Sequence, residues 1–425
     1  MITSPRIHLG DYAVSPVHGF LPTGLPLRIL PHNYYAPWEK LAGQLPTLIK
    51  TGQIRDLVDD LPVLTTTWLQ SEAEWRRAYS ILGFLTHAYI WGGEKPKDVL
   101  PPCISKPFLE ISRALGLPPC ATYAAVTLWN FTSISDTNVT EPDHLSVLTS
   151  FTGTKDEEWF MVISVAIEAK GARLLPLMLD AIEAVTAQDT SQLTALLCRF
   201  TDGLVDLTRT LNRMYEHNQP HVFFHQLRPF LAGSKNMAAA GLPNGVFYDV
   251  GHGDGEWHQY SGGSNAQSSL IQTFDIFLGV SHSATGGTSM KSSGTSYIQE
   301  MRNYMPASHK RFLEALSSLS NIRPFVNSPQ VDSSLKEAYN AAVLALTSFR
   351  DAHIQMVSRY IIVPARKQIP PDLKVKSGDT INLATASAQA KGSSETNSMG
   401  LSGTGGTSLI PFLKHTRDTT KSATC

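Results

Sequence analysis

Cysteine is scarce in this chain, and the few cysteines lie far apart. The 425 residues include four of them, Cys103, Cys120, Cys198 and Cys425, without a Cys-x-x-Cys pair. This spacing excludes a disulfide-stapled scaffold, a zinc site of the usual spacing and covalent attachment of a haem through Cys-x-x-Cys-His. We therefore expect reduced thiols and a cytoplasmic protein.

An excess of charge of either sign is also missing. Lys and Arg number 35 against 36 Asp and Glu, which gives a formal net charge of -1. Binders of nucleic acid or of anionic membranes concentrate Lys and Arg in patches, so neither partner is expected. The N-terminus has no basic segment followed by an apolar one, and no stretch approaches the roughly 18 apolar residues of a membrane span.

Apolar residues recur at helical spacing through most of the chain, with little enrichment in β-branched residues. The pattern predicts an all-α fold. Ser71 and Glu74 form a capping box before a helix that Gly92 should end, and Pro46 and Gly52 should interrupt an earlier helical stretch. A second capping box, Ser334 with Glu337, predicts the start of a helix that must end near Pro364.

His353 lies in the apolar stripe of that last helix, with Phe349, Val357 and Tyr360 on the same face. A histidine in such a place is either a core residue satisfied by a carbonyl or a ligand that binds iron through its neutral nitrogen. His87 lies on another apolar face and has no partner ligand at a suitable spacing, so we expect it to be a packed core residue.

Three further segments carry unusual residues. Arg228 stands among phenylalanines in "HVFFHQLRPFLAG", which favours an anionic ligand, and Ser164 interrupts a strongly apolar helix that begins at Glu157. "SGGSNAQSS", residues 261–269, is either a flexible linker or a functional segment. Residues 367–407 are poor in large apolar side chains, which predicts a mobile lid or a linker ending in "GTGGT".

Taken together, these segments resemble the indoleamine 2,3-dioxygenases, a family of cytosolic haem enzymes. The resemblance is carried, in family order, by "RRAYSILGFLTHAYIWGG", "FFHQLRPFLAG", "SGGSNAQSSLIQTFDIFLG", "MRNYMPASHKRFLEAL", "RDAHIQMVSRYI" and "GTGGTSLIPFLK". It implies an all-helical fold in two domains, a smaller one over residues 1–148 and a larger one over 149–425. Haem b would lie between them.

The resemblance also implies roles for particular residues. His353 becomes the proximal iron ligand, and Asp275 and Arg350 become a pair on the proximal side that orients it. Arg228 becomes the partner of the substrate carboxylate, and Ser164 and Phe223 share its catalytic role. The remaining matches are Tyr123, Phe160 and Phe224 in the substrate pocket, Gly263, Ser264 and Asn265 along the haem edge, and the closing loop from Thr404 to Thr407, with Asn265, Thr404 and Thr407 also binding substrate.

The activity implied is cleavage of the indole C2–C3 bond of L-tryptophan by O2 to give N-formylkynurenine, the first step of the kynurenine pathway. It requires ferrous haem and an external reductant, and we expect a monomer. The matched distal residues are neutral at pH 7 and His225 should point away, which disfavours a peroxidase. The alternative is a catalytically weak paralogue that serves as a haem-binding sensor or carrier. Pro229 directly after Arg228 predicts a kink in the segment that aims the guanidinium.

Overall fold

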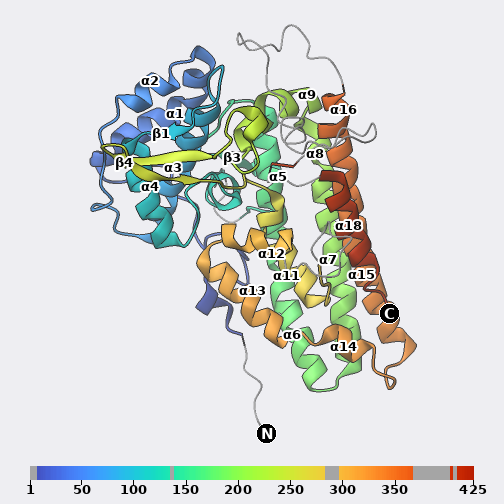
Figure 1. Cartoon of the computed structure of the whole chain (residues 1–425). Coiled ribbons are helices and arrows are strands. Elements are labelled where there is room, and N and C mark those ends of the chain that lie inside the picture. Colours follow the sequence, from blue (N-terminus) through green and yellow to red (C-terminus); the bar gives the residue numbers. More distant parts are fainter. Residues whose placement is uncertain (1–6, 135–137, 283–295, 367–402, 405–408) are drawn as a thin grey trace.

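Helices form most of the regular structure, as the sequence predicts (Figure 1). The structure is a computed structural model that describes residues 7–134, 138–282, 296–366, 403–404 and 409–425. The predicted mobile segment therefore lies outside the described residues, apart from Gly403 and Thr404. Within the described part, no helix has the length and apolar character needed to cross a membrane.

The N-terminal part consists of α1 (Ala36–Thr51), α2 (Ile54–Asp59), α3 (Glu72–Trp91) and α4 (Pro102–Leu115). Gly52 ends α1 in the left-handed conformation, as predicted, but α1 continues through Pro46. The apolar face of α1, which buries Leu41, Leu45 and Leu48, keeps the helix intact despite the hydrogen bond that Pro46 removes. Ser71 caps α3 by accepting a hydrogen bond from the backbone N–H of Glu74, and α3 ends at Gly92.

Two small sheets supplement the helices. β1 (Val99–Leu100) pairs in parallel with β4 (Val246–Gly251), and β5 (Asp254–His258) continues this sheet in antiparallel orientation. β2 (Phe131–Ser133) pairs with β3 (Leu145–Val147) in a separate antiparallel ladder. The predicted domain boundary at residues 148 and 149 falls between β3 and the next helix, and it stays a prediction.

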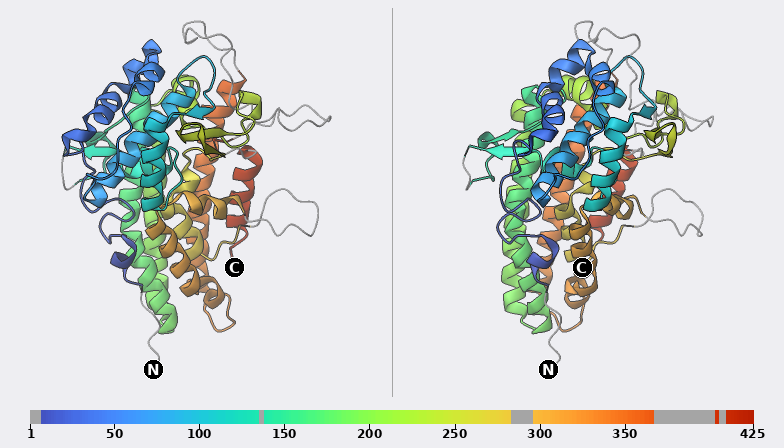
Figure 2. Two further views of the ribbon diagram at one scale, coloured as in Figure 1. Left: turned by 60° about the vertical axis from the view of Figure 1, so that its left-hand side comes forward. Right: turned by 90° about the vertical axis from the view of Figure 1, so that its left-hand side faces the viewer.

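Long helices make up the rest of the molecule (Figure 2). The main ones are α5 (Lys155–Ala172), α6 (Leu174–Thr186), α7 (Thr190–Asn212), α11 (Ser269–Phe277), α13 (Ala307–Leu319), α15 (Ser333–Val357) and α18 (Leu409–Lys421). α15 packs along both α7 and α18, and Figure 1 shows these three helices side by side. Shorter helices connect them: α8 (Met214–His217), α9 (Pro220–Val222), α10 (Arg228–Leu231), α12 (Tyr297–Met301), α14 (Ile322–Val326) and α16 (Val363–Ala365).

The start of α15 differs from the prediction. Asp332, and not Ser334, is the N-cap: its carboxylate accepts a hydrogen bond of 3.0 Å from the backbone N–H of Leu335. The hydroxyl of Ser334 donates to the same carboxylate, so Ser334 supports the cap from inside the helix. Aspartate and serine are comparable N-caps, and the aspartate two positions earlier takes the role.

Two π-helical turns each lead into a short helix that contains a proline. One covers Phe223–Leu227 and leads into α10, where Pro229 occupies the first turn; the other covers Ser358–Ile362 and leads into α16, which contains Pro364. The irregularity predicted from Pro229 is thus a wide turn at the place where Phe223 and Arg228 are presented. Such turns are frequent at functional sites.

Candidate active site

A cavity of about 250 Å³ collects most of the residues predicted for the site, although they come from segments far apart in the sequence. Its wall is largely apolar and is built from α5, α11, α15 and the turn before α10. The predicted residues that line it are Tyr123, Phe160, Ser164, Phe223, Arg228, Gly263, Ser264, Asn265, Asp275, Arg350, His353 and Thr404. Phe224 is not among the lining residues, and Thr407 lies outside the described residues.

The ring of His353 faces this cavity from α15 and makes no hydrogen bond to any described residue. Burial lowers the pKa of His353 to about 4, and the charge of Arg350 acts in the same direction. The imidazole is therefore neutral at pH 7, with a nitrogen lone pair available to a metal. A core histidine of the other kind would donate a ring N–H to a carbonyl oxygen.

His87 shows that other arrangement and confirms the prediction of a packed core residue. One ring nitrogen lies 2.7 Å from the carbonyl oxygen of Phe230, and the other accepts from the backbone N–H of Ala121 at 3.0 Å. Burial lowers the pKa of His87 to about 4. Both nitrogens are thus engaged, and His87 has no capacity left for a ligand.

Arg228 places a positive charge in the apolar wall. Its side chain is 3% exposed, and burial lowers its pKa to about 10, so the guanidinium is still charged at pH 7. Phe224, one turn earlier, lies with its ring 5.6 Å from the guanidinium carbon. Phe224 thus packs against Arg228 and does not line the cavity. A buried guanidinium in such surroundings favours a bidentate carboxylate ligand.

Aromatic rings in mutual contact form part of the wall of the same cavity. The rings of Phe160 and Phe223 lie 5.0 Å apart, and Tyr360 meets Phe223 edge to face at 5.8 Å. Ser164, one turn after Phe160, donates to the carbonyl of Phe160. Because these rings contact one another, a flat aromatic ligand would pack against the side of the cluster that lines the cavity. His225 is not among the lining residues, in agreement with the direction predicted from the helix period.

The glycine-rich segment 261–269 is packed rather than flexible, which contradicts its interpretation as a linker. The backbone N–H groups of Gly233 and Gly262 lie 3.4 and 3.3 Å from the carbonyl oxygen of Thr404, whose hydroxyl donates to the carbonyl of Gly263. A Cβ at Gly262 would lie 2.0 Å from the carbonyl oxygen of Leu231. Only glycine allows the two backbones to cross so closely.

Asp275 and Arg350 form the predicted pair. Both carboxylate oxygens lie 2.7 Å from one guanidinium nitrogen, and His282 contacts the same carboxylate at 3.0 Å. Thr420 from α18 contacts the other side of the guanidinium. Burial raises the pKa of Asp275, but the charge of Arg350 and the contact with His282 outweigh burial, and the net shift is downward. The proposed role of this pair in orienting His353 stays a prediction.

Sequence reasoning missed two polar residues at the cavity. Glu168, a buried carboxyl behind the wall, accepts hydrogen bonds from Tyr123 and Ser268. Asn218 lines the cavity, and its side-chain oxygen has no hydrogen-bond partner among the described residues. Glu168 carried a signal, because it is a charge in the apolar run that begins at Glu157. Asn218 carried none, because it lies in the polar stretch before Pro220.

These groups fit a haem. An uncharged imidazole without a hydrogen-bond partner among the described residues faces a mainly apolar cavity, and Ser264 supplies a polar group of the kind that propionates require. A mainly helical chain with such an imidazole and a buried guanidinium in the same cavity fits the class of histidine-ligated haem proteins.

Comparison with known proteins identifies the class more closely. The family model described as indoleamine 2,3-dioxygenase matches residues 8–423, so the chain belongs to this family of haem-dependent oxidoreductases. It is 43% identical to an indoleamine 2,3-dioxygenase of Penicillium citrinum, over 99% of this chain and 89% of the relative. It is 41% identical to that of Saccharomyces cerevisiae, over 97% and 92%. A 6-hydroxytryptophan 2,3-dioxygenase of Fusarium equiseti is 39% identical, over 97% and 96%.

Proposed function

We propose that this chain cleaves the indole C2–C3 bond of L-tryptophan with O2 and releases N-formylkynurenine. The observation that carries the proposal is that the neutral imidazole of His353 and the charged guanidinium of Arg228 face the same apolar cavity. Haem b held by His353 would supply the activation of O2. Both oxygen atoms enter the product, so the external reductant serves only to bring the iron to the ferrous state.

The chain's own residues bind and orient the substrate. Arg228 pairs with the carboxylate, and the contacting rings of Phe160 and Phe223 pack together against the indole. Ser164 and Tyr123 line the pocket as neutral groups. The phenol of Tyr123 donates to Glu168, and burial raises its pKa well above its ordinary value, so it stays protonated. The apolar wall excludes water from the reacting atoms.

A hydroxylated tryptophan is a second candidate substrate. The side chain of Asn218 is 5% exposed and lines the cavity, and its amide nitrogen contacts the sulfur of Met214 at 3.4 Å. The amide oxygen, which has no partner among the described residues, would accept a hydrogen bond from a donor on the ligand. The relative from Fusarium equiseti is named for 6-hydroxytryptophan.

Two spectra test the proposal and separate it from a haem sensor or carrier. The purified, haem-loaded protein should show a Soret band that shifts when tryptophan is added. With tryptophan, O2 and a reductant, absorbance of N-formylkynurenine should then increase. A Soret band without product formation from tryptophan or hydroxytryptophan would favour the sensor, which has no use for Arg228.

A further inference from the structure

A carboxyl group lies directly behind the wall of the cavity. Glu168 is on α5, one turn after the cavity-lining Ser164, and it is 1% exposed. Its Oε1 accepts two hydrogen bonds, one of 3.0 Å from the phenol of Tyr123 and one of 2.7 Å from the hydroxyl of Ser268. Glu168 itself does not line the cavity, so it acts on any ligand only through these two partners.

Both partners belong to walls of the cavity that come from distant parts of the chain. Tyr123 precedes the π-helical turn Ala124–Leu128, and its backbone N–H donates to the side chain of Gln267 at 2.8 Å. Ser268 caps α11 by accepting from the backbone N–H of Ile271. The carboxyl of Glu168 therefore joins three elements: α5, the turn after Tyr123, and the segment that leads into α11.

We propose that Glu168 is a positioning residue of the dioxygenase site, which clamps Tyr123 to Ser268 and so sets the width of the substrate pocket. The inference rests on the proposed function, because it names what that pocket needs in order to hold tryptophan. Deprotonation of Glu168 would strengthen the two hydrogen bonds of the clamp, because an ionised oxygen accepts from hydroxyl groups more strongly than a neutral one.

Burial favours the neutral form of this carboxyl, and its two hydrogen bonds favour the charged form. Burial raises the pKa of Glu168 to about 7, although the hydrogen bonds from Ser268 and Tyr123 act in the opposite direction. Oε2 has no hydrogen-bond partner among the described residues. Each form leaves Oε2 unsatisfied among the described residues, since the acid has an O–H without an acceptor and the carboxylate an oxygen without a donor.

Few charged groups come near this carboxyl from the elements around it. The N-terminal segment, which carries His18, packs Gly19 against the backbone of Glu168. α11 carries Asp275, which Arg350 engages, and Ser269, which contacts the neutral His309 of α13. None of these groups contributes to the pKa of Glu168, and the phenol of Tyr123 is the titratable group in contact with it.

The first test compares tryptophan binding to haem-loaded E168Q, E168A and E157Q with that of the original chain, by the Soret shift at pH 6.5. E168Q keeps a neutral acceptor and should bind within about threefold, whereas E168A should bind at least about tenfold more weakly. Glu157 is a matched control: it is a buried carboxyl on the same helix, bonded to the backbone N–H groups of Phe151 and Thr152 and not to the cavity wall. E157Q should lower the melting temperature and leave tryptophan binding unchanged.

The second test follows pH. The ratio of the tryptophan affinity of the original chain to that of E168Q should rise between pH 6.5 and 8.3, because Glu168 ionises near this range and its hydrogen bonds strengthen. Arg228 and the substrate ammonium titrate equally in both proteins. E168A with Y123F should be no worse than E168A alone, since the two residues act as one unit. Tight binding to E168A, or identical pH profiles of the original chain and E168Q, would overturn the proposal.

A third measurement needs neither haem nor tryptophan, and it distinguishes failure of the clamp from failure of the proposed function. The pKa of Glu168 is raised on folding, so its stabilising effect is complete below the unfolded value and disappears as pH rises through about 7. From pH 5 to 8, the melting temperature of the haem-free chain should fall by about 3 °C relative to E168Q. If the original chain does not bind tryptophan but this difference appears, the substrate is wrong and the raised pKa of Glu168 is right; no difference would refute the raised pKa.

Discussion

The imidazole of His353 and the guanidinium of Arg228 face one cavity, yet their substitution should produce opposite defects. H353A should fold but lack haem, because the side chain points into the cavity and the variant removes the nitrogen without a hydrogen-bond partner among the described residues. The ratio of Soret to protein absorbance and the helical circular dichroism measure the two effects. Added imidazole should restore haem to H353G. Full haem content with a histidine-ligated spectrum in H353A would contradict the assignment.

R228L should bind haem normally but should bind tryptophan much more weakly than the original chain. Removal of one partner from a buried charge pair costs roughly 2 to 5 kcal/mol, which is about 30-fold to several thousand-fold in affinity. The tryptophan affinity of R228K should lie between those of R228L and the original chain, because an ammonium group cannot form the bidentate pair. Binding of 3-methylindole, which has no carboxylate, serves as the control and should not change. A tryptophan affinity within twofold of the original would exclude Arg228 as the anchor.

Residue types that carry a chemical signal in an apolar context could be predicted from the sequence. His353 and Arg228 stand out in that way, and the structure brings both to the cavity. Asn218 could not be found, because its importance comes from a missing partner, which only the folded arrangement defines. The pairing of Glu168 with Tyr123 and Ser268 likewise depends on contacts between distant segments.

At the scale of elements, the N-cap of α15 offers a direct comparison of two neighbouring residues. D332A should lower the free energy of unfolding by about 1 kcal/mol, the usual value of an N-cap. S334A should cost clearly less, since Ser334 donates only to the exposed carboxylate of the cap. Urea denaturation of the two variants measures both values. Equal losses of stability in the two variants, or a larger loss in S334A, would show that Ser334 acts as the N-cap, as its spacing suggests.

The crossing of Gly262 over the end of α10 allows a second comparison. In G262A the new methyl group would meet the carbonyl of Leu231 at 2.0 Å, and the backbones must separate at a cost of about 1 to 3 kcal/mol. Tryptophan affinity should fall with stability, because Gly263 lines the cavity. Gly43 is the control: it lies on α1 with open space around its Cα. G43A should be stabilised by about 0.5 to 1 kcal/mol.

Helices were predictable where apolar period and caps agree, as in α3. The prediction failed where tertiary packing outweighs a local signal: Pro46 does not break α1, and a serine at the right spacing does not cap α15. The short strands gave no signal, because β1 has two residues and its partner β4 lies far along the chain. The composition of segment 261–269 suggests a linker, and only its contacts with Leu231 and Thr404 show that it is packed.

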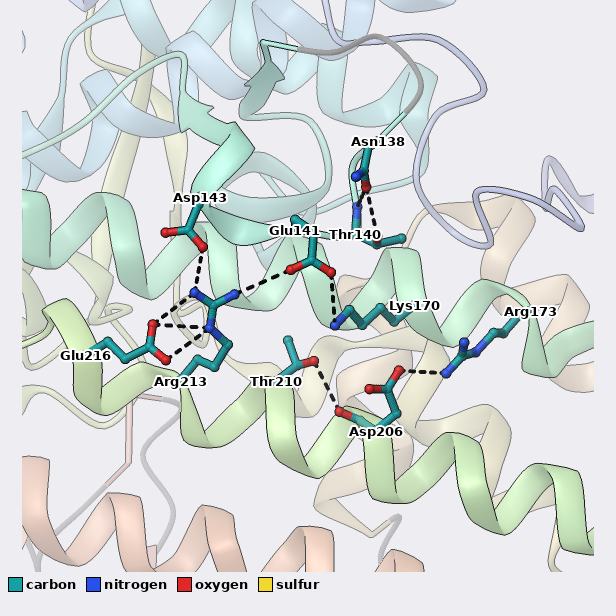
Figure 3. Close-up of polar contacts among 10 residues, drawn as sticks. All are labelled: Asn138, Thr140, Glu141, Asp143, Lys170, Arg173, Asp206, Thr210, Arg213 and Glu216. Carbon is teal, nitrogen blue, oxygen red and sulfur yellow. Dashed lines mark hydrogen bonds and ion pairs between the residues drawn. The ribbon is translucent and has the colours of Figure 1, made fainter.

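Across the whole molecule, ion pairs join the segment between β2 and β3 to the long helices (Figure 3). Arg213, at the end of α7, lies 2.6 Å from the carboxylate of Asp143 and 3.5 Å from that of Glu141, and it also pairs with Glu216. Glu141 in turn reaches Lys170 of α5 at 3.5 Å. The hydrogen bond from Arg213 holds the pKa of Asp143 below its ordinary value.

R213A should therefore lower the free energy of unfolding by about 1 to 2 kcal/mol at low salt, because several exposed pairs and the stacking of Arg213 on Trp159 are lost together. About half of this loss should disappear in 1 M salt, where exposed charges are screened. R173A removes a single exposed pair with Asp206 and should cost about 0.5 kcal/mol or less. A loss in R213A that does not depend on salt would show that packing, not charge, is responsible.

The parallel pairing of β1 with β4 affects how the chain folds during synthesis. Val99 aligns with Phe247, so β1 has no partner until a large part of the chain has left the ribosome. Non-local pairing of this kind slows folding, and an unpaired strand edge promotes aggregation. Nascent chains that stall before β4 should therefore be protease-sensitive and should recruit chaperones, even though α1 to α4 are already complete. Release from this state should coincide with the emergence of the β4–β5 hairpin.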